Sequence, residues 1–407
     1  MTTRDNLRRH LEGGIDLGNL PKTFQDAIKI ARELKVRYLW IDALCIIQNE
    51  DDHEDWKREC GKMASIYRNS YLTVAATWAN SATGGCFITP DPGVVTGPIM
   101  MRKVSHFPFI PTLEDSEDFP ILTRAWTYQE RLLAPRVIYF GHQEILWDCL
   151  ERHTCECGGA TIPEQGVARR GFHGQTAVND SGKLWRRVIE QYTPLQLTCP
   201  DDKLPALSGL AQAMGPRQES YLAGLWEDTL LSDMCWTRVW PMERGGHQGR
   251  WRAPSWSWAS VDGPIRYDAG LRIGDGTINE DHARVCEAKC TPAGPSLTGQ
   301  VKDGFVELEG FLIPVSFEAH QIRAHCSDLE SLRLAWYPDR IYDTEQMPAA
   351  HLIPLVTGWR GSCWTFHGLV VKPYGQGTEM TRIGLATYLS KRIFSFSGCE
   401  KQVVTII

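Results

Sequence analysis

The spacing of apolar side chains in the N-terminal part of the chain predicts three helices. A short helix over residues 4–12 ends at the glycine pair 13–14. A second helix begins at Pro21, which suits the first helical position, and extends to about residue 34. In a third helix, over about residues 54–67, apolar side chains again recur every three or four positions. The second and third helices are therefore expected to bury one face each.

Short apolar runs that follow these helices predict strands. Residues 38–42 and 71–76 are largely apolar and stand between polar turns. A further helix is expected near residues 125–133, and strands are expected at 137–140 and 144–147. Helices that alternate with strands over short connections are typical of a parallel sheet covered by helices. The predicted fold class of this part of the chain is therefore α/β.

The pattern changes in the rest of the chain. Helices are expected over residues 183–192, 204–214 and 222–236. Beyond residue 251 the periodicity shifts to alternation, most clearly over residues 305–315, and this predicts strands. We therefore expect an α/β domain, a helical region and a β-rich C-terminal domain, over residues 1–160, 161–245 and 246–407.

The composition is that of a globular protein, since 43% of the 407 residues are apolar and 23% are charged. A net charge of −6 without a basic stripe argues against nucleic-acid binding. No apolar run reaches the roughly 18 residues that a membrane span requires. The 13 cysteines are odd in number and scattered, so we expect reduced thiols in a cytoplasmic protein. The 15 tryptophans predict a core rich in aromatic rings.

Two blocks of the sequence resemble a known family. The first block contains Pro21-Lys22-Thr23-Phe24, then Tyr38-Leu39-Trp40-Ile41-Asp42-Ala43-Leu44-Cys45, and later Gly84-Gly85-Cys86-Phe87. The second block is Arg124-Ala125-Trp126-Thr127-Tyr128-Gln129-Glu130-Arg131. In order and spacing, both blocks are similar to the fungal heterokaryon incompatibility (HET) domain.

HET domains usually begin with a strand that carries a Ser-Tyr-(Cys or Thr)-Trp-Gly motif ahead of the Pro-Lys-Thr-Phe block. In this chain the block already starts at Pro21, and the strand motif does not precede it. The resemblance therefore describes an N-terminally truncated HET domain whose first strand is missing. Loss of that strand would leave a neighbour in the sheet with unpaired backbone groups.

The resemblance implies a fungal protein of self/non-self recognition. Its expected role is programmed cell death in vegetative (heterokaryon) incompatibility, or innate immunity. HET domains have been compared with TIR domains, some of which cleave NAD, so a TIR-like fold and NAD(P) as substrate, without a cofactor, are implied. A protein partner such as an immune receptor, or a homo-oligomer, fits the same role. The alternatives are a non-enzymatic signalling or oligomerisation module and an enzyme of secondary metabolism.

Glu130 is the lead catalytic candidate that the resemblance implies. Trp126 and Glu130 lie one helical turn apart, in the Trp-x-x-x-Glu spacing that surrounds the catalytic glutamate of TIR-type NAD hydrolases. A carboxylate there could stabilise the positive charge that develops on the ribose as nicotinamide leaves. Alternatively, Glu130 pairs with an arginine such as Arg124, and Trp126 belongs to the core. Arg124 could instead bind a phosphate, and Gln129 stands beside Glu130 in the same block.

The end of the predicted strand at residues 38–42 supplies further candidates, because ligands bind at the carboxyl ends of parallel strands. Asp42 could accept a hydrogen bond from a ribose or cap the following turn. Cys45 could be a nucleophile if a neighbour lowered its pKa, and Gln48 could line the crevice or bind loop backbone. Glu59 is a further acidic candidate, and an exposed structural position is its alternative.

Soft metal ligands cluster at Cys149, His153, Cys155 and Cys157. Their spacing matches no paired Cys-x-x-Cys zinc site, and a second pair of ligands is not evident. We therefore expect no metal centre in this protein.

Overall fold

A computed structural model of the chain describes most of its residues. The chain divides into two compact units, Met1–Ala177 and Val178–Ile407, and each is described by itself. The expected division into three domains stays a prediction. The described residues are 1–49, 54–88, 119–142, 144–156, 158, 172–173, 181–214, 220–239, 251–267, 279–318, 321–326, 333–342, 349–360, 362–391, 394, 396 and 399–407.

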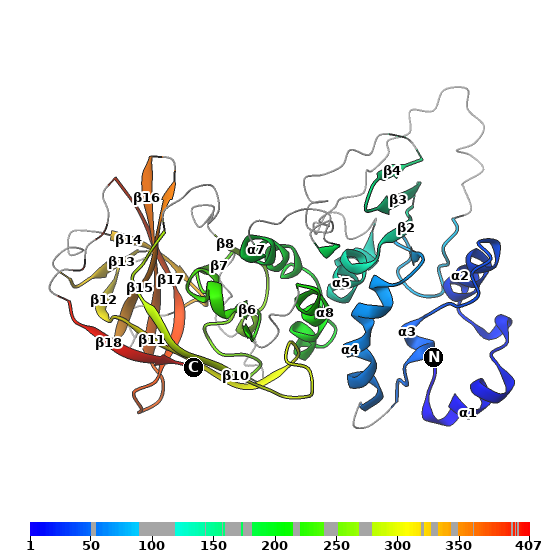
Figure 1. Ribbon diagram of the computed structural model, residues 1–407, viewed down its shortest axis with the longest axis horizontal. Helices are drawn as coiled ribbons and strands as arrows, with labels where there is room; N and C mark the ends of the chain where they lie inside the picture. Colours follow the sequence, from blue (N-terminus) through cyan, green and yellow to red (C-terminus); the bar gives the residue numbers. More distant parts are fainter. Residues whose placement is uncertain are drawn as a thin grey trace. The chain divides into compact units, whose positions relative to one another are not determined.

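The helices expected in the first unit are present (Figure 1). α1 spans Arg4–Gly13 and ends at Gly14, whose φ of 75° is the left-handed conformation that glycine adopts readily. α2 spans Lys22–Glu33, and α4 spans Glu54–Arg68. α5 covers Ala125–Leu133, with the bounds that the sequence predicts.

The first unit also contains a four-stranded sheet in the order β1-β2-β3-β4. The strands β1 and β2 are parallel, whereas β2–β3 and β3–β4 are antiparallel. The connection between β2 and β3 is too short for a crossover helix, so these strands can only run in opposite directions. The α/β class is confirmed, but the described sheet is mixed, not parallel, and a TIR-like fold is not confirmed. The strands are β1 (Thr73–Ala75), β2 (Arg136–Phe140), β3 (Ile145–Cys149) and β4 (His153–Cys155).

The strand predicted at residues 38–42 is not part of this sheet. Ile41 has an extended backbone, with φ −135° and ψ 120°, but residues 37–41 pair with no described strand. The one-turn helix α3 occupies Asp42–Cys45. Tyr38 is 80% exposed, so the run is apolar without being buried. An apolar run becomes a strand only where a neighbour accepts its backbone hydrogen bonds, and this run has no such neighbour among the described strands.

A buried carboxylate joins α2 to the segment that follows β1. Asp26 is fully buried, forms ion pairs with Lys22 and Lys29, and accepts a hydrogen bond of 3.1 Å from the backbone N–H of Cys86. Burial acts to raise the pKa of Asp26, but these donors outweigh it and hold the pKa below its usual value. Gly85, with φ 88°, lies so close that a Cβ would come within 2.7 Å of an Asp26 oxygen. This contact links the Pro-Lys-Thr-Phe block to the Gly-Gly-Cys-Phe block in the folded chain.

The second unit begins with two of the expected helices, α7 at Ser181–Tyr192 and α8 at Pro205–Ala213. The helix predicted at residues 222–236 is wrong, because only α9, Leu230–Asp233, is an α-helix there. A hairpin turn at residues 223–224 interrupts it, with φ of 47° at Ala223 and 100° at Gly224, values that no α-helix contains. The short strands are β5 (Tyr221–Leu222), β6 (Leu225–Trp226), β7 (Trp236–Arg238) and β8 (Ile265–Tyr267). The 3-10 helices of the chain include Leu17–Asn19, Pro120–Thr123, Pro200–Lys203, Glu227–Thr229 and Trp258–Ser260.

Tryptophan rings form much of the core of the second unit around this hairpin turn. The carbonyl oxygen of Gly224 accepts hydrogen bonds from the indole N–H groups of Trp185, at 2.8 Å, and Trp258, at 2.9 Å. The carbonyl oxygen of Trp256 accepts one of 3.0 Å from Trp236. All four rings are buried, which confirms the expected aromatic core. The indole N–H groups of Trp185, Trp236 and Trp258 are thus satisfied by backbone carbonyls, whereas no hydrogen-bond partner is described for that of Trp256.

The turn at Gly224 gives a first prediction. A Cβ at this position would lie 2.7 Å from Nε1 of Trp258, and the residue needs a positive φ. We expect Gly224→Ala to lower the free energy of unfolding of the second unit by about 2–4 kcal/mol, measured by urea unfolding. Gly375→Ala is the matched control, because Gly375 also has a positive φ of 61° but open space around it. Equal losses in both variants would contradict the steric explanation.

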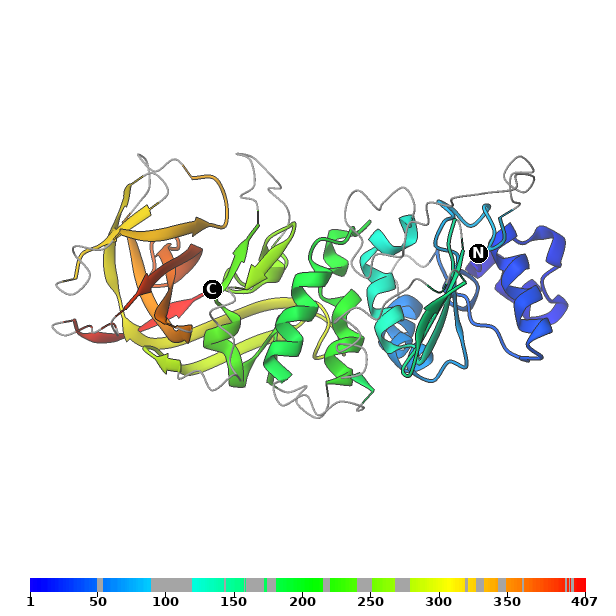
Figure 2. The ribbon, with the colours of Figure 1, turned by 90° about the horizontal axis from the view of Figure 1, so that it is seen from above.

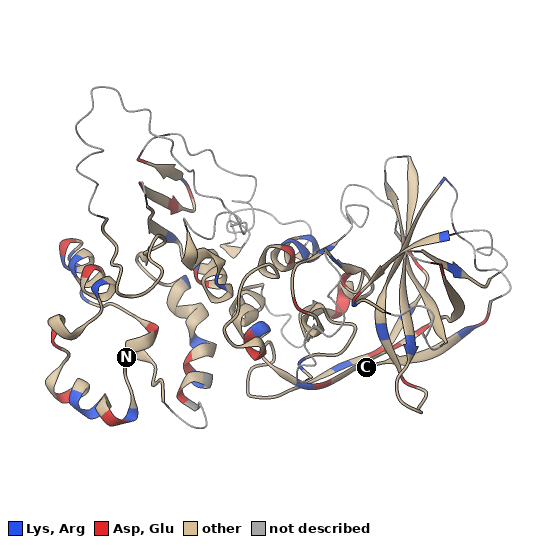
Figure 3. Ribbon diagram, turned by 180° about the vertical axis from the view of Figure 1, so that it is seen from behind, with Lys and Arg blue, Asp and Glu red and all other residues tan. Residues whose placement is uncertain are grey.

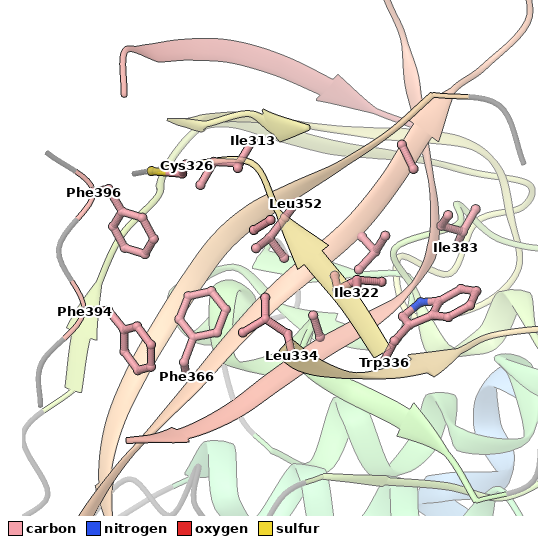
Figure 4. Packing of buried hydrophobic residues seen from close by; sticks show 14 residues of the cluster. Ile313, Ile322, Cys326, Leu334, Trp336, Leu352, Phe366, Ile383, Phe394 and Phe396 are labelled. Atoms are coloured by element: carbon pink, nitrogen blue, oxygen red, sulfur yellow. The ribbon is translucent and has the colours of Figure 1, made fainter. Parts of the chain in front are cut away.

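The C-terminal strands form a ten-stranded sheet that closes on itself (Figure 2). The pairings run from β17 through β14, β13, β12, β15 and β16 back to β17, so these strands form a barrel. This confirms a β-rich C-terminal part. The side chains of Leu334, Leu352 and Phe366 pack inside it (Figure 4). The strands are β9 (Asn279–Asp281), β10 (Arg284–Pro292), β11 (Val301–Phe311), β12 (Ile313–Glu318), β13 (Gln321–Ala324), β14 (Arg333–Pro338), β15 (Ala350–Arg360), β16 (Cys363–Pro373), β17 (Met380–Ser390) and β18 (Lys401–Ile406).

Candidate functional site

Helix α5 carries Glu130 in a partly buried position. Most residues of α5 are buried, whereas Glu130 keeps some exposure to solvent. The ring of Trp126 on α5 meets the ring of Trp56 on α4 edge to face, with 6.0 Å between the centroids. The two helices therefore pack against each other, and side chains of α4 can reach Glu130.

Tyr67, in the last turn of α4, forms a hydrogen bond with the carboxyl group of Glu130. Its ring also contacts Trp40 edge to face, with 5.6 Å between the centroids. Burial, together with the negative charges of Glu130 and Asp42, raises the pKa of Tyr67 well above its ordinary value. The Tyr67 hydroxyl therefore stays protonated at neutral pH and donates to the ionised carboxylate.

Two charged residues act on Glu130 in opposite directions. Asp42 is exposed at the start of α3, where its side chain accepts a hydrogen bond of 2.7 Å from the backbone N–H of Ala43. Its negative charge disfavours ionisation of Glu130. Arg124 is exposed at the N-cap of α5, and its positive charge favours ionisation. The charges of both Asp42 and Arg124 thus act on Glu130.

These neighbours leave Glu130 with a pKa that is raised to about 7. Burial is the largest cause and the charge of Asp42 is the second, while the Tyr67 hydrogen bond and the charge of Arg124 act to lower the pKa. A carboxyl group that titrates near neutral pH can hold or release a proton under physiological conditions. Such groups are concentrated at functional sites, where burial and like charges are combined to shift a pKa.

Comparison with known families identifies this region. The family model described as "Heterokaryon incompatibility protein (HET)" matches residues 2–130. The N-terminal part of the chain is a HET domain. The matched range contains Asp42, Tyr67 and Arg124 and ends at Glu130, and it implies a role in heterokaryon incompatibility in general. Comparisons with curated proteins and with solved structures gave no match.

Three other predicted site residues of the HET domain have different surroundings. Cys45 is exposed at the end of α3. The side-chain amide of Gln48 donates a hydrogen bond of 2.9 Å to the backbone carbonyl of Ile46. Gln48 therefore binds loop backbone, which is one of the two roles expected for it from the sequence. Glu59 forms an ion pair of 2.8 Å with Lys62, and both belong to the acidic and basic positions that Figure 3 colours along the ribbon of α4. The Lys62 hydrogen bond is the main reason why the pKa of Glu59 lies below its usual value.

Within α5 of the HET domain, the two remaining predicted site residues are Trp126 and Gln129. Trp126 packs against Trp56, and Gln129 is only 1% exposed. Tyr67 is the residue that sequence reasoning missed, because the apolar spacing over residues 54–67 predicts only that the helix buries one face. The available signal is that a tyrosine on a buried face needs a partner for its hydroxyl.

The cysteine and histidine tract of the first unit forms hydrogen bonds and ion pairs. Sγ of Cys149 accepts a hydrogen bond from the backbone N–H of Arg152, and Nδ1 of His153 lies 3.7 Å from a carboxylate oxygen of Asp148. Cys157 lies outside the described residues. Within the described part of the chain, no group of three or more histidine, cysteine or acidic side chains could hold a metal ion. No described helix combines the length and the apolarity that crossing a membrane would need.

Proposed function

We propose that the HET domain is an effector of programmed cell death in fungal vegetative incompatibility or innate immunity, and that it cleaves NAD(P) in the cytoplasm. One observation supports this activity: Glu130 titrates near pH 7 beside Arg124, Asp42 and a hydroxyl of Tyr67. A carboxyl group that ionises near pH 7 can stabilise positive charge on a sugar when a glycosidic bond is cleaved. A neighbouring arginine can bind a phosphate of the same substrate.

In this reaction the bond between the ribose C1′ and the nicotinamide nitrogen breaks, and nicotinamide leaves with the bonding electron pair. Ionised Glu130 stabilises the oxocarbenium-like charge on the ribose. A water oxygen then bonds to C1′ and releases a proton, so that NAD⁺ and water give nicotinamide, ADP-ribose and H⁺. Arg124 is suited to bind a phosphate of the substrate, and Tyr67 holds the carboxylate in place by its hydrogen bond.

The proposal predicts a specific pH dependence. Because the reaction needs ionised Glu130, nicotinamide release by the purified chain should rise with pH through an inflection near 7. Asp42→Asn removes a charge that raises this pKa, so the inflection should move to lower pH. Arg124→Gln removes a charge that lowers it, so the inflection should move to higher pH. Each shift is expected to be on the order of half a pH unit or more, measured from kcat/KM for nicotinamide release.

The outcome of the same assay decides the proposal. Glu59→Gln is the matched control, because Glu59 is an acidic residue of the same domain that is paired with Lys62. This control should keep the inflection of the wild-type chain. Absence of nicotinamide release, or equal release by Glu130→Gln, would contradict NAD(P) cleavage.

A second candidate function is a non-enzymatic module that signals by binding a protein partner or a second copy. It is supported by large apolar side chains that are exposed after α2, with Leu34 46%, Tyr38 80% and Leu39 39% exposed. In this case, toxicity on overexpression in a fungal host should survive Glu130→Gln and be lost in Tyr38→Ser. Loss of toxicity in Glu130→Gln alone would exclude the non-enzymatic module.

A further inference from the structure

A cavity of about 750 Å³ lies in the second unit. It is lined by residues of the segments 200–201, 251–262, 339–342 and 372–383, and by Ile407. Its volume falls in the range of roughly 300–1,000 Å³ that is usual for small-molecule sites. All lining residues belong to Val178–Ile407, whereas Glu130 belongs to Met1–Ala177.

One wall of the cavity is a fixed ion pair. Arg382 is 4% exposed and binds the carboxylate of Asp339 through two nitrogens, at 2.9 and 3.2 Å. Its remaining N–H groups donate to the carbonyl oxygens of Met234 and Trp236, both at 2.6 Å. The guanidinium also stacks on the Trp236 ring, 3.3 Å from its centroid. This wall keeps its shape whether or not a ligand is present, because all these contacts are internal.

A second ion pair lines the cavity, and a further cation lies close to its carboxylate. Arg252 binds the carboxylate of Asp262 at 2.7 Å. Lys203 is buried, donates to the carbonyl of Val261 and lies 4.0 Å from the same Asp262 oxygen. Asp262 thus offsets the charge of Arg252, while burial lowers the pKa of the Lys203 ammonium to about 7.

Two more cations line the cavity, and the described part of the chain shows no carboxylate paired with either of them. Among the described residues, neither Arg340 nor Lys372 forms an ion pair or a hydrogen bond with an acidic side chain. Both lie beside Tyr342: Nζ of Lys372 is 5.9 Å from its ring centroid, and the charge of Arg340 acts on its hydroxyl. The lining cations are Arg252, Arg340, Lys372 and Arg382, and the lining carboxylates are Asp201, Asp262 and Asp339.

Aromatic side chains complete the lining. Trp251 is 48% exposed and Tyr374 is 54% exposed, and both belong to the cavity together with Tyr342. The Trp251 and Tyr374 rings are therefore accessible to a ligand in the cavity. A planar ring can stack on them, and unpaired cations beside them attract an anion.

We propose that this cavity binds a nucleoside phosphate, with the phosphate at Arg340 and Lys372 and the base against the aromatic residues. The fixed arginine–aspartate pairs shape the cavity and contribute no free charge. Recognition therefore rests on the two unpaired cations and on the rings. A ligand that lacks either the phosphate or the planar base makes only half of the contacts.

Isothermal titration calorimetry on the full chain tests this proposal with three probes: AMP, adenosine and inorganic phosphate. AMP is expected to bind at least about tenfold more tightly than either of the other probes. The double variant Arg340→Gln/Lys372→Gln should weaken AMP binding at least about tenfold and leave adenosine binding unchanged. Tyr374→Leu should reduce the advantage of AMP over inorganic phosphate.

Two control variants make the result decisive. Lys401→Gln removes one exposed positive charge from β18 of the same unit and should leave AMP affinity within about twofold of the wild-type value. Lys302→Gln should also leave AMP affinity unchanged, because Lys302 is exposed and does not line this cavity. Absence of AMP binding, equal affinity for AMP and adenosine, or AMP binding that is unchanged in the double variant would overturn the proposal. None of these results depends on whether the HET domain cleaves NAD(P).

Discussion

The Glu130→Gln variant is expected to be more stable than the wild-type chain at pH 8 and to release nicotinamide at least about a hundredfold more slowly. Glutamine has the shape of the protonated carboxyl group and still accepts the hydrogen bond from Tyr67. It does not carry the negative charge, which burial and Asp42 make unfavourable in the folded protein. The same substitution therefore removes the reactive charge and the energetic cost of keeping that charge.

The sign of the stability effect follows from the pKa of about 7 in the folded chain, against 4.5 as the ordinary value of glutamate. Between these two values the folded state binds more protons than the unfolded state, so stability falls as pH rises and then levels off above pH 7. We expect Glu130→Gln to match the wild-type chain in stability near pH 4.5. At pH 8 it should gain on the order of 1–3 kcal/mol, observed as a rise of a few degrees in Tm.

A structural role for Glu130 predicts the opposite result. If the carboxylate served mainly to pair with Arg124, its loss would destabilise the first unit at pH 8. Thermal unfolding at pH 5 and pH 8 therefore separates the two roles without any assay of activity. Glu130→Ala is a suitable control, since it loses both the charge and the Tyr67 hydrogen bond and should be less stable than Glu130→Gln at both pH values.

The helices of the first unit were predictable because their signals are local. The bounds of α5 (Ala125–Leu133) follow from its apolar periodicity, and α1 (Arg4–Gly13) ends where glycine permits a positive φ. Residues 38–42 show where such signals fail, since whether an apolar run becomes a strand depends on a distant neighbour. The predicted helix at residues 222–236 failed for a different reason, because a two-residue turn at Ala223 and Gly224 overrides helical spacing.

The candidate site was partly predictable for a similar reason. The convergence of Glu130, Asp42 and Arg124 could be expected from the two family blocks that contain them. The role of Tyr67 depends on how α4 packs against α5, which sequence spacing does not reveal. The cavity of the second unit was not predictable at all, since it combines residues from four segments that are far apart in the chain.

The largest loss of stability is expected for Arg382→Met in the second unit. This side chain supplies four hydrogen bonds and a stacking contact inside the core. Burial already raises the pKa of Asp339 although Arg382 opposes this shift, so removal of the guanidinium leaves a buried carboxylate with much less compensation. We expect a loss of about 3–5 kcal/mol, measured by urea unfolding with tryptophan fluorescence, which also reports on Trp236 beneath the guanidinium.

An exposed ion pair of the same length provides the matched control. Arg284 binds Glu309 at 2.9 Å, as Arg382 binds Asp339, but its side chain is 67% exposed. Water solvates both partners of that pair, so Arg284→Met should change stability little. Arg382→Met combined with Asp339→Asn should recover part of the loss, because the double variant leaves no buried charge unpaired. Equal losses in Arg284→Met and Arg382→Met, or no recovery in the double variant, would show that packing and not burial of the charge sets the cost.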